Sequence, residues 1–156
     1  MTRNRGADLI STWFGCGYFP VGPGTVGSLG ALAVAYGLVA YADWRPLFFL
    51  WLTAAATAPA IWASDLTARS GACKDPSHVV VDEVLGQWLA LAGATALNWK
   101  SWLGAFLLFR ALDIAKPWPI RRFERLPGGT GIVADDLAAG AVAALVLFGA
   151  GCFNLY

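Results

Sequence analysis

Charged residues are scarce in this sequence. They make up 13% of the 156 residues, while 58% are hydrophobic; an ordinary soluble domain has about 25% charged residues. This composition excludes a disordered chain and is too apolar for a water-soluble monomer. The formal net charge is only +1, whereas nucleic-acid-binding domains concentrate basic residues on one surface. We therefore expect no nucleic acid partner.

Cysteine and histidine are also rare. The three cysteines, Cys16, Cys73 and Cys152, are odd in number and lack the spacing of metal ligands, so neither a disulfide framework nor a zinc site is expected. The single histidine, His78, is interpreted as a polar loop residue rather than a catalytic base. The length suits one domain, predicted over residues 1–156, and no obligate protein partner is evident.

What the sequence does contain is a set of long charge-free intervals. A helix needs roughly 17 to 25 apolar residues to cross a bilayer, and residues 46–64 and 137–156 meet this length. Glycine and proline interrupt an earlier interval, which leaves a predicted helix at about 26–42. Shorter segments at 84–99 and 101–115 complete the set, and the second of these is either a full span or re-entrant. We expect an all-α, compact integral-membrane bundle of about five short helices.

The bundle is expected to be closely packed, because small residues let helix backbones approach one another in lipid. Gly93 and Gly140 are examples. The orientation follows from Lys and Arg in the loops, which favour the cytoplasmic side. Two of the loop cations, Arg45 and Lys100, fall on one side. Eight fall on the other, which predicts a cytoplasmic N-terminus: Arg3, Arg5, Arg69, Lys74, Lys116, Arg121, Arg122 and Arg125.

Every unusual polar segment falls on this predicted cytoplasmic side. The segments are residues 14–28, 74–83 and 110–136. The two loops on the opposite side are short and lack comparable motifs. The function is therefore expected at one face of the bundle.

Two acidic pairs and a single aspartate stand out in these segments. Asp82-Glu83 opens the third predicted helix, Asp135-Asp136 opens the fifth, and Asp113 lies near the end of the fourth. Either pair alone is readily explained as a helix cap that complements the helix dipole. Five converging carboxylates would repel one another unless a cation neutralised them. Oxygen ligands without a His or Cys cluster favour a hard ion, Mg²⁺ or Mn²⁺.

Basic residues accompany the single aspartate. Arg110, Asp113 and Lys116 are spaced so that neighbours in the series share a helix face. They form either a plain ion pair with basic side chains that reach for the interface or part of a functional site, which is the default reading for ionisable residues at membrane depth. In the second reading Lys116 is a phosphate ligand.

Two glycine-rich segments precede helices. In Pro23–Ser28 the backbone N–H groups could approach an anion, and Thr25 or Ser28 could cap the helix or donate to phosphate. A flexible turn with a Thr or Ser cap is the plain alternative. The segment is not a Walker A loop, because the Lys-Ser/Thr ending is absent. Gly128–Gly131 carries the same ambiguity.

Four motifs in this order resemble the phosphatidylglycerophosphatase A family over nearly the whole chain. They are G-x-G-x-x-P-x-x-P-G-T-x-G-S, D-P-x-x-x-V-x-D-E-x-x-G, F-R-x-x-D-x-x-K-P-x-P-I and G-G-x-G-I-x-x-D-D-x-x-A-G, at residues 15–28, 75–86, 109–120 and 128–140. Departures are small: Gly22 stands where Ala is frequent, Leu112 where an aromatic residue is common, and Glu124 where Asp is usual. The resemblance implies Mg²⁺-dependent hydrolysis of phosphatidylglycerophosphate to phosphatidylglycerol and inorganic phosphate. It places the enzyme, a phosphoric monoester hydrolase, at the cytoplasmic face of the bacterial inner membrane.

The residues suggest how such a reaction would run. Hydrolysis of a phosphomonoester needs neutralised charge and an in-line nucleophile, which a metal-activated water can provide. The rival mechanism forms an aspartyl-phosphate. The expected metal ligands are Asp82, Glu83, Asp135 and Asp136, the expected catalytic residues are Asp113, Asp136 and Glu83, and the expected substrate-binding residues are Gly24, Thr25, Ser28, Arg110, Lys116 and Gly129.

Two other functions fit parts of the pattern. Intramembrane carboxylates on short, glycine-interrupted helices are also typical of a small ion or proton transporter, but these carboxylates gather at one predicted mouth and the sequence has no inverted repeat. An assembly protein with loops that bind anionic lipid would explain Arg121, Arg122 and Arg125, but not the acidic pairs. The enzyme is the better reading, with the transporter as its alternative.

Overall fold

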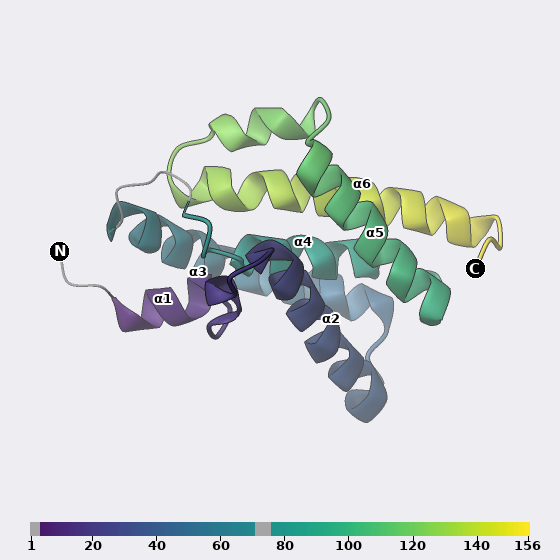
Figure 1. Cartoon of the computed structure of the whole chain (residues 1–156). Coiled ribbons are helices and arrows are strands. Elements are labelled where there is room, and N and C mark those ends of the chain that lie inside the picture. The colour runs from purple at the N-terminus through teal and green to yellow at the C-terminus, as the bar shows by residue number, and fades with distance from the viewer. Residues whose placement is uncertain (1–3, 71–75) are drawn as a thin grey trace.

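The computed structural model describes residues 4–70 and 76–156 and is all-helical over these residues, as the sequence predicts. Arg3, Lys74 and Asp75, used above in the orientation or the motifs, lie outside the described residues. Six α-helices and two short 3-10 helices follow one another (Figure 1): α1 (Arg5–Ser11), η1 (Cys16–Tyr18), α2 (Pro23–Ala42), α3 (Pro46–Ser70), α4 (Val81–Ala92), α5 (Trp99–Ala115), η2 (Ile120–Arg125) and α6 (Gly129–Cys152).

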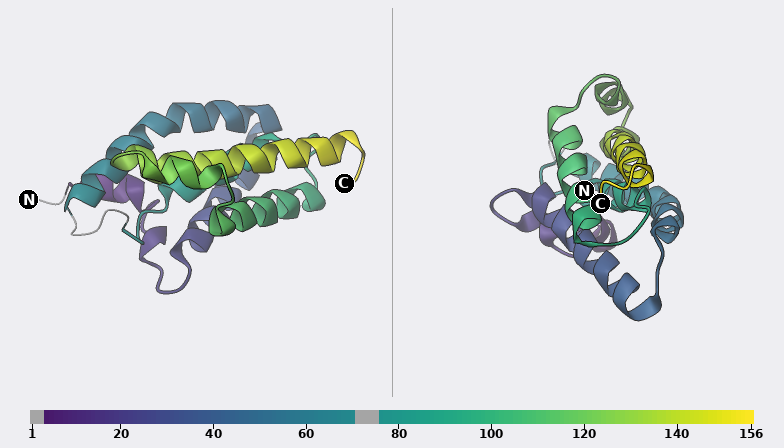
Figure 2. Two further views of the ribbon diagram at one scale, coloured as in Figure 1. Left: turned by 90° about the horizontal axis from the view of Figure 1, so that it is seen from above. Right: turned by 90° about the vertical axis from the view of Figure 1, so that its right-hand side faces the viewer.

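The five long helices alternate in direction. In Figures 1 and 2, α2, α4 and α6 begin toward the end of the molecule that holds the N-terminus, and α3 and α5 finish there. We call this the site end. The loops that carry η1 and η2 lie at the site end, whereas residues 43–45, residues 93–98 and the C-terminus lie at the opposite end. The predicted alternation of five helices is therefore present, and the direction of insertion stays a prediction.

Two helices begin earlier than the sequence predicts. α2 starts at Pro23 rather than near residue 26, because proline is suited to the first turn of a helix and Gly22 adopts the positive φ of 61° that the preceding turn requires. α6 starts at Gly129 rather than at residue 137. The backbone N–H of Gly129 donates to Asp65 Oδ1 at 3.3 Å, which caps the helix from α3.

The early start of α6 changes the setting of the second acidic pair. Asp135 and Asp136 do not open the helix, as the sequence suggested, but lie almost two turns inside it. Both are nearly buried, each with 4% of its surface exposed. Capping of a helix N-terminus therefore does not explain this pair, and another reason is needed for two buried carboxylates.

α4 is the central element of the bundle. It was predicted at residues 84–99 but ends at Ala92, because Asn98 caps α5 and the chain must turn between the two helices. Nine of its 12 residues are buried, and it contacts α2, α3, α5 and α6. A length of 12 residues spans only about 18 Å, so α4 is a core helix rather than a membrane span.

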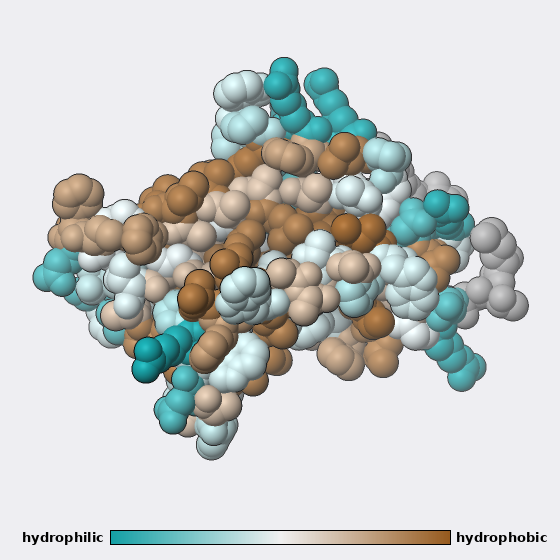
Figure 3. Space-filling view, turned by 180° about the vertical axis from the view of Figure 1, so that it is seen from behind, coloured by the Kyte–Doolittle hydropathy of each residue, from teal (hydrophilic) through white to brown (hydrophobic). Residues whose placement is uncertain are grey.

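Within the described ranges, three helices are long and apolar enough to cross a membrane: α2, α3 and α6. The outward surface of the bundle carries large exposed apolar side chains, among them Tyr36, Trp51, Leu107, Leu145 and Phe148. Figure 3 shows such side chains along much of one face, with hydrophilic side chains gathered mainly toward its edges. The chain leaves the site end along α4 and returns to it along α5. The three long apolar helices α2, α3 and α6 therefore still alternate in direction.

The backbones of α4 and α6 approach closely at glycine, which confirms the prediction for Gly93 and Gly140. A Cβ added to Gly140 would lie 2.4 Å from the carbonyl oxygen of Gly86. One added to Gly93 would lie 2.2 Å from the carbonyl oxygen of Ala144. Both obstacles are backbone atoms, so larger residues require the helices to separate.

We expect Gly140→Ala to destabilise the protein by about 1–3 kcal/mol, the usual cost of overpacking. Gly149→Ala in the same helix is the control, because a Cβ there meets nothing within 4 Å, and it should leave stability unchanged or raise it slightly. The measurement is the thermal unfolding midpoint in detergent. Equal midpoints for the two variants would show that the contact between α4 and α6 is not tight.

Candidate active site

Three helices meet at one glycine of α4. A Cβ on Gly86 would lie 2.3 Å from Cε2 of Phe109 on α5 and 2.7 Å from the carbonyl oxygen of Asp136 on α6, and Gly140 lies against the Gly86 backbone. Phe109 is fully buried. The absence of a side chain at Gly86 is therefore what allows α4, α5 and α6 to meet.

An acidic residue lies one turn from this junction on each helix. Asp82 precedes Gly86 by four residues, Asp136 precedes Gly140 by four, and Asp113 follows Phe109 by four. Because α5 runs opposite to α4 and α6 (Figure 1), all three steps lead toward the site end. Residues four apart share a helix face. The packing at the junction therefore brings these carboxylates together.

Asp82, Glu83 and Asp136 form the closest acidic cluster among the described residues. Each offers one carboxylate oxygen, and these oxygens lie within 4.8 Å of one another. Asp82 and Asp136 are 8% and 4% exposed. The carboxylates come from α4 and α6, the two helices that Gly86 and Gly140 hold in contact, so their spacing depends on the backbone rather than on a flexible loop.

The cluster lines a cavity of about 300 Å³. Its walls come from the start of α2, the segment before α4, and the site-end turns of α4, α5 and α6. The lining residues are Pro23, Gly24, Pro76, Ser77, Val79, Asp82, Glu83, Asp113, Lys116, Ile132, Asp135 and Asp136. All five acidic residues singled out from the sequence therefore line one cavity.

Two cations balance part of this charge. Arg110 pairs with Asp113 on the same helix, and Lys116 Nζ donates to Asp135 Oδ2 on α6. Burial alone would lower the pKa of Lys116, but the hydrogen bond and the charge of Asp135 outweigh it, so the pKa is raised and the ammonium stays protonated. Among the described residues, five carboxylates thus face two cations.

Several carboxylate oxygens have no protein donor. Glu83 Oε2, Asp135 Oδ1 and Asp136 Oδ2 are buried without a hydrogen-bond partner among residues 4–70 and 76–156. Burial raises the pKa of Glu83, Asp82 lowers it through a hydrogen bond, and Asp113 raises it further. Unpartnered buried carboxylates are costly unless a cation coordinates them. The donor set, all oxygen, fits a hard divalent ion.

The start of α2 closes the cavity from the side. A Cβ on Gly24 would lie 2.1 Å from Glu83 Oε1 and 3.3 Å from Arg110 Nη1. Only glycine lets the first turn of α2 approach these charged groups, and helix N-termini attract anions. Gly24 therefore lies beside a carboxylate of the cluster and beside a cation that could bind phosphate.

The segment before α4 is braced from the N-terminal region. The backbone N–H of Val80 donates to the Ser11 carbonyl oxygen at 2.8 Å, and a Cβ on Gly17 would collide with the His78 carbonyl. The imidazole of His78 stacks on Tyr18, with ring centroids 5.6 Å apart, and does not line the carboxylate cavity. These contacts fix the start of α4 and hence Asp82 and Glu83.

Comparison with known proteins identifies the family to which this chain belongs. The family model described as phosphatidylglycerophosphatase A matches residues 9–150. The chain belongs to this family. Membership makes it an enzyme, a phosphoric monoester hydrolase, and confirms the resemblance inferred from the four motifs.

Curated relatives cover most of the chain. It is 36% identical over 141 residues to the phosphatidylglycerophosphatase A of Escherichia coli (strain K12), covering 90% of this chain and 80% of that protein. The Haemophilus influenzae phosphatidylglycerophosphatase A is also 36% identical, with 90% and 85% covered. A putative phosphatidylinositol-3-phosphatase of Bacteroides thetaiotaomicron is 37% identical over 147 residues, with 89% of each chain covered. No solved structure matches.

Not every residue expected to bind substrate lies at the cavity. Ser28 is fully buried, and its Oγ donates to the Gly24 carbonyl oxygen at 3.0 Å inside α2. Thr25 does not line the cavity either; its side chain lies near Gly22 instead. Both residues support the first turn of α2 and thereby the position of Gly24.

Gly129 lies in a different part of this phosphatidylglycerophosphatase-family fold. Its N–H donates to Asp65, and it lines a separate cavity of about 320 Å³ with Asp65 and Arg69. A Cβ there would lie 2.2 Å from the Ile61 carbonyl oxygen. The glycine is thus explained by the packing of α6 on α3, and it does not line the carboxylate cavity.

Sequence reasoning missed the residues that shape the site without charge. Pro23, Ser77, Val79 and Ile132 line the cavity, and Gly86 determines where the three helices meet. The one available signal was the four-residue spacing between glycine and aspartate on two helices. That spacing predicts that the aspartates converge only when it is known which helices pack together at the glycines.

We expect Lys116→Gln to destabilise the protein by about 2 kcal/mol, less than the roughly 3–5 kcal/mol for a fully buried pair, because a quarter of the Lys116 side chain is exposed. The loss leaves Asp135 buried without its cation. The double variant Lys116→Gln/Asp135→Asn should recover most of the loss. The measurement is the unfolding midpoint in detergent without divalent ions, with Lys100→Gln, exposed at the opposite end, as control. A double variant as unstable as Lys116→Gln would contradict the pairing.

Proposed function

We propose that this enzyme hydrolyses the terminal phosphomonoester of phosphatidylglycerophosphate to phosphatidylglycerol and inorganic phosphate, with Mg²⁺ as cofactor. The observation that carries the proposal is the buried cluster of Asp82, Glu83 and Asp136, whose oxygens lie within 4.8 Å of one another at one end of an apolar helical bundle. The names of the relatives in Escherichia coli and Haemophilus influenzae support the choice of lipid.

The cofactor assignment is supported by the donor set. Asp82, Glu83 and Asp136 would hold the ion. Asp135 faces the cavity while bound to Lys116, and it would either add a ligand or contribute to the negative charge around the ion. When bound, Mg²⁺ supplies positive charge to the phosphoryl oxygens and makes a water more acidic. Mg²⁺ accepts carboxylate and phosphate oxygens together, which suits a phosphomonoester at this cluster.

The chain's own residues supply the remaining roles. Arg110 lies beside Gly24, and its Nε is buried without a partner among the described residues, so it is suited to donate to a phosphate oxygen. Lys116 places a positive charge at the wall of the cavity itself. Asp113 is held by Arg110 and is the proposed group that orients the attacking water and accepts its proton.

A lipid substrate suits the location of the cavity. The acyl chains would lie along the apolar outer faces of the helices, and the headgroup would enter at the site end. The proposed cytoplasmic orientation is supported by the basic residues described there, compared with Arg45 and Lys100 at the opposite end: Arg5, Arg69, Lys116, Arg121, Arg122 and Arg125. The positive charge favours the cytoplasmic side.

Direct attack by water is the proposed mechanism, and an aspartyl-phosphate is its rival. Single-turnover hydrolysis in oxygen-18 water distinguishes them when labelled phosphate is also sought on the protein. Direct attack puts oxygen-18 into the product phosphate and leaves no label on the chain. Trapped phosphoprotein would support the rival.

With phosphatidylglycerophosphate in detergent micelles, we expect phosphate release with Mg²⁺ and none with a chelator. Asp136→Asn should lower kcat at least about 100-fold, as expected when a group that stabilises transition-state charge is lost. Asp43→Asn at the opposite, exposed end is the control, because Asn tolerates the left-handed backbone of Asp43. Activity that persists in Asp136→Asn would reject this site; phosphatidylinositol 3-phosphate, tested in parallel, checks the choice of lipid.

Gly24→Ala should lower kcat about 10-fold or more, because its methyl group must displace the Glu83 carboxylate and loss of positioning has large effects on rate. Folding should be retained, since the obstacle is the end of a side chain. Gly37→Ala in the same helix, where a Cβ meets nothing within 4 Å, is the control for helix propensity. Equal activity of the two variants would show that α2 does not constrain the cluster.

A further inference from the structure

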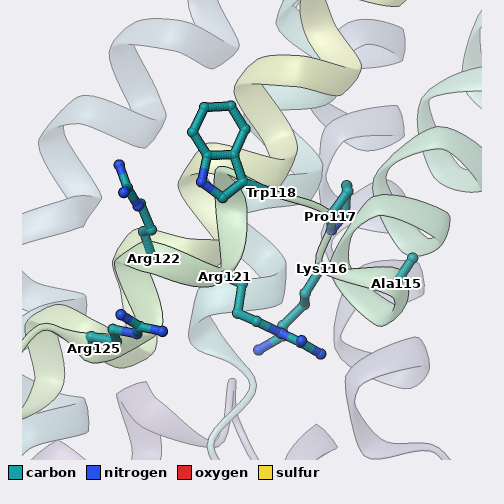
Figure 4. A pocket seen from close by; sticks show the side chains of 7 residues that line it. All are labelled: Ala115, Lys116, Pro117, Trp118, Arg121, Arg122 and Arg125. Carbon is teal, nitrogen blue, oxygen red and sulfur yellow. The ribbon is translucent and has the colours of Figure 1, made fainter.

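A second cavity, of about 520 Å³, lies where α5 ends and η2 begins. The lining residues, shown in Figure 4, are Ala115, Lys116, Pro117, Trp118, Arg121, Arg122 and Arg125. Every charged residue among them is a cation. We call this the basic cavity.

The three arginines of the basic cavity have no acidic partner in the part of the chain that the structure describes. Among residues 4–70 and 76–156, no carboxylate lies within 4 Å of the guanidinium groups of Arg121, Arg122 and Arg125. Arg122 instead lies over the Trp118 ring, 5.5 Å from its centroid. Figure 4 shows Lys116 and Arg121 among the side chains that line this cavity. Like charges gathered in this manner favour an anion between them.

The basic cavity adjoins the carboxylate cavity. Lys116 lines both, with its ammonium on Asp135. Among the described residues, one cavity is thus lined mainly by carboxylates and suited to a metal ion, the charged residues that line the other are all cations, and Lys116 belongs to both. A ligand that reaches both would need two anionic groups a short distance apart.

The basic cavity also has the character of a membrane interface. Ile114 and Trp118 beside it are 72% and 75% exposed, and Phe123 is 41% exposed. Exposed aromatic and apolar side chains among Arg residues are typical of surfaces at the level of lipid headgroups. The anion expected here therefore belongs to a lipid.

We infer that the basic cavity binds the phosphodiester of the substrate while its phosphomonoester lies at the carboxylate cluster. The inference rests on the proposed function and deepens it. Phosphatidylglycerophosphate carries a phosphodiester next to the acyl chains and a phosphomonoester one glycerol further out. Arg121 and Arg125 thereby become specificity-determining residues that favour this lipid over phosphatidic acid, which has a phosphomonoester but no phosphodiester.

The test compares both lipids in micelles of an uncharged detergent with Mg²⁺. For Arg121→Gln/Arg125→Gln we expect the KM for phosphatidylglycerophosphate to rise about 10-fold, equivalent to about 1.4 kcal/mol, with kcat nearly unchanged, because the phosphodiester is not altered by the reaction. The KM for phosphatidic acid should change less than about twofold, because exposed charges that do not contact the ligand contribute little energy. If phosphatidic acid is hydrolysed too slowly, its inhibition constant against phosphatidylglycerophosphate replaces the KM.

Arg45→Gln, an exposed arginine at the opposite end, is the matched control and should leave both lipids unaffected. An equal rise for both lipids would show that the cavity attracts anionic surfaces or the reacting phosphate, and would overturn the inference. An unchanged KM for both lipids would also overturn it. So would a rise in the inhibition constant of inorganic phosphate as large as the rise in KM for phosphatidylglycerophosphate. A wild-type enzyme inactive on phosphatidylglycerophosphate would instead reject the proposed function.

Discussion

Mutual repulsion of carboxylates gathered in one cavity is the constraint on which this structure depends. Five of them line one cavity, and the helices that carry them can meet only because Gly86 has no side chain. Helices in lipid gain little from the hydrophobic effect, so close backbone contact must supply much of their association. The same contact between Gly86 and Gly140 that stabilises the bundle also sets the spacing of Asp82 and Asp136. The contact between Gly86 and Gly140 therefore determines both the stability of the bundle and the geometry of the site.

The fold was predictable where it depends on long apolar segments. The helices at 46–64 and 26–42 could be predicted because a charge-free apolar segment long enough to cross a bilayer indicates a membrane-spanning helix. Boundaries failed where tertiary contacts decide them. Gly129 opens α6 because Asp65, distant in sequence, caps it. α1, η1 and η2 were missed, since a seven-residue helix and 3-10 turns depend on packing rather than on periodicity.

The acidic residues of the site were predictable because carboxylates near predicted membrane segments are costly and demand a reason. Their convergence was an inference from topology, and the structure provides its cause in the junction at Gly86. Roles given to Ser28 and Gly129 from glycine-rich motifs did not identify cavity residues, because the same motif serves helix packing. The pairing of Lys116, which lines both cavities, with Asp135 of α6 could not be inferred from local sequence, because the two residues are 19 positions apart.

The central claim is that Asp82, Glu83 and Asp136 form one divalent-cation site. Titration of the detergent-solubilised protein with Mn²⁺, followed by electron paramagnetic resonance, tests it most directly, because Mn²⁺ accepts the same oxygen ligands as Mg²⁺. We expect saturable binding that Mg²⁺ displaces and that Asp136→Asn abolishes, with the fold intact by circular dichroism. Saturable binding of equal strength in folded Asp136→Asn protein, or none in the wild type, would contradict the claim.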